Sequence, residues 1–198
     1  MKNILVPIGS SVNALNTLQY AIDFAQAVDA KIYLVHVYSS PKISGNLLNV
    51  DQIMERDSKA TLKDHLNNVD TKDVKIVTST LKGYSIIDTL KQLNKLLDID
   101  LIIASTKNDG ADETVFLGKI TGSIIKDTKV PVLIIPALVK FKPIEKIMMT
   151  IKSGSIKSVA TLDLLVKIQN TFNSKISLLQ VKTPKLDAKD LDLNDTLK

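Results

Sequence analysis

The chain has 198 residues, of which 44% are hydrophobic and 24% are charged, a balance that is typical of a soluble globular protein. It has no cysteine, which excludes disulfides, thiolate chemistry and cysteine-bound metals, and its two histidines lie far apart in sequence, which argues against a histidine-based zinc site. The net charge of +5 comes almost entirely from lysines scattered among acidic residues, so we interpret these lysines as solvated and expect no nucleic-acid partner.

Membrane and export signals are missing from the sequence. No apolar run approaches the roughly 18 residues that a spanning helix needs, and no secretory pattern precedes the first apolar segment. We therefore predict a cytoplasmic protein with no membrane partner. Aromatic residues make up only 4% of the chain, so the core must be built from Ile, Leu and Val.

The first two thirds of the chain alternate short apolar runs with helical patterns. In chain order the sequence predicts a strand at 4–8, a helix capped by Ser10 or Ser11 and ending near 27, a strand at 31–37, a helix capped by Asn49 or Asp51 and ending near 66, a weak strand at 74–78, a helix at 86–97, a strand at 100–105, a helix at 118–126 and a strand at 130–135. Strands this rich in Ile, Leu and Val, separated by helices, predict a parallel sheet covered on both faces.

The chain then partly repeats itself. "KNILVPIGSS" at 2–11 resembles "EKIMMTIKSG" at 145–154, and "AKIYLVHVYSSP" at 30–41 resembles "SKISLLQVKTP" at 174–184. A single period of about 140 residues predicts domain duplication, with the second copy stopping after strand, helix (156–172) and strand. We expect a complete domain at 1–138, a linker at 139–144, a partial second domain at 145–182 and a polar tail at 183–198. Half of a parallel sheet cannot bury both its faces, so the second unit must lean on the first, on another chain or on sequence absent here.

The stretches "NILVPIGSSVNALNTLQYAIDFA", "AKIYLVHV", "IDLIIAST" and "LGKITGSIIKDTKVPVLIIP" occur in an order and spacing that resemble the universal stress protein family. The resemblance covers residues 1–138 and, as a first half-domain, 145–182. It implies an adenine-nucleotide alpha hydrolase-like fold: a doubly wound α/β domain with a five-stranded parallel sheet of order 3-2-1-4-5. Members of the family usually dimerise along the fifth strand.

The nucleotide-binding branch of that family carries Gly-x2-Gly-x9-Gly-Ser/Thr after the fourth strand and an Asp at the end of the first. Here the two leading glycines become Ser105 and Asn108, the third is kept as Gly118, and Lys119 replaces the Ser/Thr. Gly9 stands in place of the Asp. A rival register would use Gly122 and Ser123, but that pair lies too close to Pro131, and we treat it as a decoy.

The replacements bear on phosphate binding in different ways. Glycines let backbone N–H groups approach a polyphosphate, so Ser105 hinders that approach, whereas Asn108 tolerates a left-handed turn. Gly9 removes an acceptor for the base or ribose. Lys119 opposes the helix dipole, which is acceptable if its side chain either reaches solvent or holds an anion.

Two hypotheses remain open from the sequence. The first is a non-enzymatic stress-response module that acts as a dimer, with a degenerate nucleotide site and no cofactor. The second is a sensor that binds ATP with Mg²⁺, or another anion, and hydrolyses ATP slowly at best. In both, the apolar edge strand should be covered by a second copy of the chain, because an open apolar edge invites aggregation. The interface residues are Val130, Val132, Leu133, Ile134 and Ile135. A further protein partner, which the sequence does not identify, is compatible with either hypothesis.

Other polar residues carry weaker signals. We expect His36 to be packed and hydrogen-bonded in its strand, and His65 to be exposed on its helix. Ser10, Ser11 and Ser153 have no neighbouring base and are interpreted as helix caps. The acidic run at 190–195 lacks the glycine and closing glutamate of a calcium loop, so no metal site is predicted.

Overall fold

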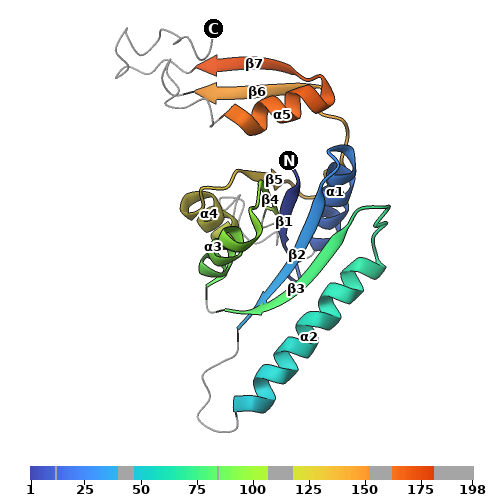
Figure 1. The fold of residues 1–198 in the computed structure, drawn as a ribbon, viewed down its shortest axis with the longest axis vertical. Coiled ribbons are helices and arrows are strands. Elements are labelled where there is room, and N and C mark those ends of the chain that lie inside the picture. Colours follow the sequence, from blue (N-terminus) through green and yellow to red (C-terminus); the bar gives the residue numbers. More distant parts are fainter. Residues whose placement is uncertain (12, 40–46, 84, 107–117, 152–161, 181–198) are drawn as a thin grey trace. The chain divides into compact units, whose positions relative to one another are not determined.

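The structure is a computed structural model that describes residues 1–11, 13–39, 47–83, 85–106, 118–151 and 162–180 (Figure 1). The chain divides into two compact units, residues 1–141 and residues 142–198. None of the described helices combines the length and apolar character that crossing a bilayer requires.

The first unit is built around a five-stranded parallel sheet in the order β3-β2-β1-β4-β5. Its strands are β1 (Asn3–Pro7), β2 (Lys31–Tyr38), β3 (Ile76–Lys82), β4 (Leu101–Ser105) and β5 (Val132–Ile135). Its helices are α1 (Ala14–Ala27), α2 (Leu47–Asn67), α3 (Ile86–Leu97) and α4 (Gly118–Asp127). The predicted fold class and strand order are therefore confirmed.

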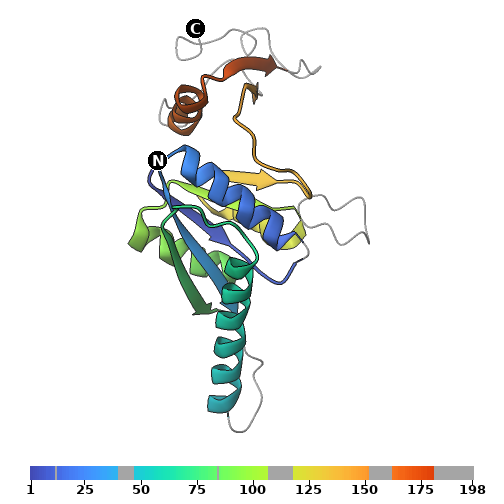
Figure 2. The same ribbon diagram turned by 90° about the vertical axis from the view of Figure 1, so that its right-hand side faces the viewer.

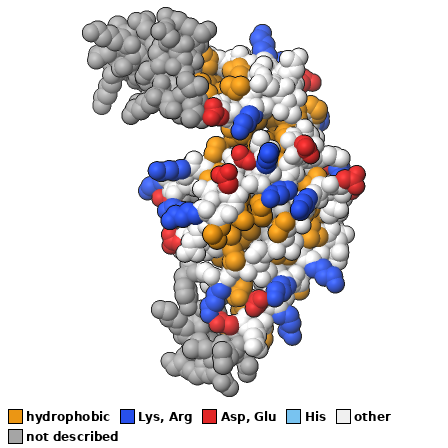
Figure 3. All heavy atoms as spheres, viewed as in Figure 1, with side chains coloured by type: hydrophobic (Ala, Val, Ile, Leu, Met, Phe, Trp, Pro, Cys, Tyr) orange, Lys and Arg blue, Asp and Glu red, His pale blue; other side chains and the backbone are white. Residues whose placement is uncertain are grey.

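Side chains alternate between the two faces of the sheet, as they must in extended strands. Leu5 and Val35 join residues of α3 and α4 in one buried cluster. Ile4 and Leu34 are fully buried on the opposite face, the side of α1 and α2 (Figures 1 and 2). Cover on the α3 side is incomplete, because hydrophobic side chains remain visible over the middle of this unit (Figure 3).

Helix α2 is long, but few of its described side chains are buried. Among its described side chains, those that are buried are Ser58, Leu62 and His65, and the ribbon extends beyond the end of the sheet (Figure 2). The prediction that Asn49 or Asp51 caps this helix is wrong, because the helix begins at Leu47. The predicted exposure of His65 is also wrong: only 7% of it is accessible.

Strand β3 lies later than the predicted strand at 74–78. Its register aligns Ile32 with Ile76 and Tyr38 with Lys82, so β3 pairs along most of β2. Hydrogen bonding to a long neighbour extends the strand through a polar stretch, Thr78 to Thr80, that an apolar pattern cannot reveal.

The second unit contains a parallel pair, β6 (Lys146–Ile151) and β7 (Lys175–Gln180), connected through α5 (Asp163–Phe172). Helix α5 has no buried residue, and β7 is exposed at all but its last position. The start of the predicted helix at 156–172, together with Ser153, lies outside the described residues.

Candidate functional site

The strand order reverses between β1 and β4, and ligands of open parallel sheets bind at such a point, beyond the carboxyl ends of the strands. Gly9 follows β1 there, Ser105 ends β4, and α4 begins at Gly118. Asn108 lies outside the described residues. Lys119 is the second residue of α4, and the position of its side chain is not described.

Asn13 is a residue of this edge that the sequence reasoning missed. It stands before α1 without making a side-chain cap bond, so the prediction that Ser10 or Ser11 caps this helix is wrong. Its side chain is buried, with 6% exposure, and Nδ2 donates to the carbonyl oxygen of Thr106 at 3.5 Å. This bond links the segment after β1 to the segment after β4, across the point where the order reverses.

The end of β4 is held by two further contacts. Thr121 Oγ1 donates to the carbonyl oxygen of Ser105 at 2.8 Å, and the backbone N–H of Thr106 donates to the carbonyl oxygen of Ile135 at 3.2 Å. Thr106 is itself only 5% exposed. The carbonyl groups of residues 105 and 106 are thus satisfied by the protein itself, which is how buried backbone groups are normally accommodated.

Gly9 leaves space beside β1. A Cβ atom built on it would meet nothing within 4 Å, and its backbone is not in the left-handed region. Gly122, by contrast, lies one turn inside α4 and not at its start.

We expect Gly9→Asp to fold as well as the parent chain, because the added side chain meets no atom. The free energy of unfolding should change by no more than about 0.5 kcal/mol, as for surface substitutions. Urea denaturation followed by circular dichroism measures it. Gly83→Asp is the contrasting variant, because a Cβ there would lie 2.4 Å from Thr89 Oγ1. A loss above 2 kcal/mol for Gly9→Asp would show that the space is not available.

His36 of β2 and His65 of α2 lie near each other in the fold, although 28 residues separate them in the chain. His36 Nδ1 is hydrogen-bonded to the hydroxyl of Ser58, so the expectation that His36 is packed and hydrogen-bonded is confirmed. Desolvation lowers the pKa of His36, and the nearby His65 lowers it further. Within the described part of the chain, no three histidine or carboxylate side chains are grouped so that they could hold a metal ion.

Strand β5 forms the edge of the sheet and pairs, among the described strands, with β4. The carbonyl oxygen of Pro131 accepts a hydrogen bond from Ile102 of β4, and that of Ile135 accepts one from Thr106, the residue after β4. Because backbone groups alternate along a strand, those of Val132 and Ile134 point to the open side. Val132, Leu133 and Ile134 are half-buried, whereas Val130 and Ile135 are buried.

These features define a parallel α/β protein whose candidate site lies at the reversal of strand order. The sequence profile of the universal stress protein family matches residues 1–136, and the chain belongs to that family.

Individual relatives agree with this assignment. A universal stress protein of Methanocaldococcus jannaschii is 26% identical over 139 residues, which are 68% of this chain and 81% of that protein. UspA of Lactobacillus plantarum has a similar fold, with a TM-score of 0.57, 21% identity and coverage of 68% of this chain and 97% of that one. A universal stress protein from Archaeoglobus fulgidus aligns over 92% of this chain and 68% of its own, with a TM-score of 0.73 and 16% identity.

Proposed function

We propose that this universal stress protein is a non-enzymatic interaction module of a stress response that works as a homodimer without bound nucleotide. Its nucleotide site is degenerate at Gly9, Ser105, Asn108 and Lys119, while Gly118 is kept. The complete domain is residues 1–138, and 145–182 is a partial second domain.

The bond between Asn13 and Thr106 carries this proposal. The Asn13 amide and the Thr106 carbonyl bond to each other at the place where a nucleotide-binding relative would offer polar groups to a ligand. A ligand that needed these groups would first have to break this hydrogen bond, whose net contribution is about 0.5–1.5 kcal/mol. The absence of a carboxylate at Gly9 removes an acceptor at the same edge.

The alternative is a sensor that binds ATP with Mg²⁺ or another anion. Two observations favour it: the open space beside Gly9, and the start of α4 at Gly118. A helix N-terminus attracts phosphate, and Lys119 would supply the neighbouring charge.

A thermal-shift titration with ATP and Mg²⁺ separates the two functions. We expect binding of millimolar nucleotide at the site of Gly118 and Lys119 to raise the melting temperature by less than about 1 °C. Saturation at 100 times Kd would instead add about 2.7 kcal/mol, or roughly 5–10 °C for a chain of this size. A saturable increase that Lys119→Ala removes would overturn the nucleotide-free proposal, and Lys126→Ala, in the last turn of the same helix, is the control.

A further inference from the structure

Three lysines stand in a row at the amino-terminal edge of the sheet, the edge opposite the candidate site. Lys2 precedes β1, Lys31 begins β2 and Lys75 precedes β3. Lys31 and Lys75 stand in register, since each precedes a residue of the pair Ile32 and Ile76, and the Ile32 N–H donates to the Lys75 carbonyl at 2.9 Å. Lys2 stands one residue before Asn3, the partner of Lys31, and its carbonyl accepts from the Lys31 N–H at 2.9 Å. Neighbouring strands lie about 4.8 Å apart, so the backbone positions of the three lysines form a row roughly 10 Å long.

Such a row is unfavourable in the absence of a counter-charge, because like charges on adjacent strands repel. Among the described residues none of the three ammonium groups forms an ion pair, although other lysines of the first unit do. The Asp100 carboxylate accepts the backbone N–H groups of Lys2 at 2.6 Å and Asn3 at 3.0 Å. The Lys31 ammonium lies 4.9 Å from the centre of the Tyr33 ring.

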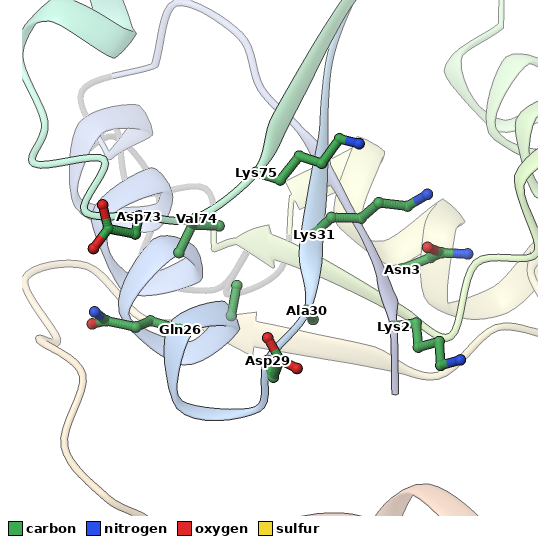
Figure 4. Close-up of a pocket in the computed structure, with 10 residues that line it drawn as sticks. Lys2, Asn3, Gln26, Asp29, Ala30, Lys31, Asp73, Val74 and Lys75 are labelled. Carbon is green, nitrogen blue, oxygen red and sulfur yellow. The ribbon is translucent and has the colours of Figure 1, made fainter.

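The row borders a pocket of about 540 Å³, a volume within the range of small-ligand sites. Asp29 and Asp73 also line it. Figure 4 shows the three lysine side chains extending toward one side of the pocket, with Asp73 on the other side. In this view the three positive groups are gathered on the side of the pocket away from Asp73.

We propose that Lys2, Lys31 and Lys75 form a binding site for an oligophosphate, a small anion with two or more linked phosphates. Lysine ammonium groups bind phosphate as point charges. The length of the row favours a chain of phosphates over a single one, which would meet two neighbouring ammonium groups at most. The site is independent of the proposed function, because it uses the opposite ends of the strands from Gly9 and Lys119.

Calorimetric titration of the full chain with tripolyphosphate tests the site. We expect saturable binding that weakens at least tenfold in the double variant Lys31→Gln/Lys75→Gln, and weaker binding of orthophosphate. The control is Lys91→Gln/Lys140→Gln, which removes the same charge from exposed positions elsewhere. No saturable heat, or equal weakening in both double variants, would overturn the proposal. Lys2→Gln provides a third variant if the double variant does not fold.

Two further ligands identify the source of the phosphates. Adenosine should not bind to the row, whereas ATP should compete with tripolyphosphate if its phosphate chain is the part recognised. An ATP response that is lost in Lys31→Gln/Lys75→Gln but kept in Lys119→Ala would belong to the lysine row and leave the proposal of a degenerate site at Gly9, Ser105 and Lys119 intact. The reverse pattern would count against both the row and the nucleotide-free function.

Discussion

Replacing Ile134 with proline is expected to convert a homodimer into a monomer. In the proposed dimer two β5 strands run antiparallel about a two-fold axis at Leu133, so that Val132 of each chain faces Ile134 of the other. Both residues direct their backbone groups to the open edge, and the two symmetric pairs exchange four hydrogen bonds.

The backbone hydrogen bonds between the two β5 strands cannot extend beyond these four. Pro136 has no N–H to donate, and the N–H of Val130 is already bonded to Thr128 Oγ1 at 3.1 Å. Proline at 134 would remove one donor from each chain, a loss of about 1–3 kcal/mol, or roughly 5- to 150-fold in the dimer dissociation constant. The monomer should still fold, because proline is tolerated in an edge strand where its nitrogen faces solvent.

Sedimentation velocity at micromolar concentration measures this change. Ile134→Val is the matched control, since it keeps both the N–H and the β-branched side chain, and it should remain dimeric. A parent chain that is monomeric at this concentration, or a dimer that survives Ile134→Pro, would show that β5 is not the interface.

Lowering the pH from 7.5 to 5.5 is expected to weaken the attachment of α2 to the sheet. Two of the three buried side chains that we find on this helix are Ser58 and His65. His65 Nδ1 is buried and makes no hydrogen bond within the described structure. Protonation of His36 would place a positive charge beside His65 in a partly desolvated position.

The sign of the effect follows from the lowered pKa of His36. The folded state favours neutral His36, so its contribution to stability is fully present above the unfolded pKa of about 6.5 and is lost as the pH falls through the folded value. The slope is at most about 1.4 kcal/mol per pH unit, and solvent reduces it because His36 is only half-buried. Two ion pairs involve residues of α2 as well, Asp51 with Lys82 of β3 and Lys59 with Glu55.

Urea denaturation at pH 7.5, 6.5 and 5.5 measures the slope, and hydrogen exchange across residues 50–67 locates it. His36→Asn is the comparison, because an amide can keep the bond to Ser58 but does not titrate. If the variant and the parent lose the same stability between pH 6.5 and 5.5, His36 is not responsible.

Elements that are set by local apolar periodicity could be predicted from the sequence, whereas those set by pairing with a distant segment could not. The five strands and four helices of the first unit follow from apolar periodicity, and α3 matches its predicted bounds because Ser85 caps it and accepts from the Asp88 N–H at 3.3 Å. Helix α2 begins earlier than predicted, and β3 follows the register of β2 and not its own apolar pattern.

The polar contacts were less predictable, because they join residues that are distant in sequence. The bond from Asn13 to Thr106 spans 93 residues, and that from His36 to Ser58 spans 22. A helical pattern placed His65 on a polar surface, yet the helix turns that side chain toward β2. The lysine row emerges only when three strands are aligned, since Lys2, Lys31 and Lys75 look like scattered surface charges in the sequence.

Sedimentation equilibrium of the full chain, with and without millimolar ATP and Mg²⁺, tests the central claim most directly. A nucleotide-independent interaction module should show twice the 21.7 kDa mass of one chain under both conditions, with the same dissociation constant. A chain that is monomeric throughout, or a dimer whose dissociation constant changes more than tenfold with ATP, would contradict it.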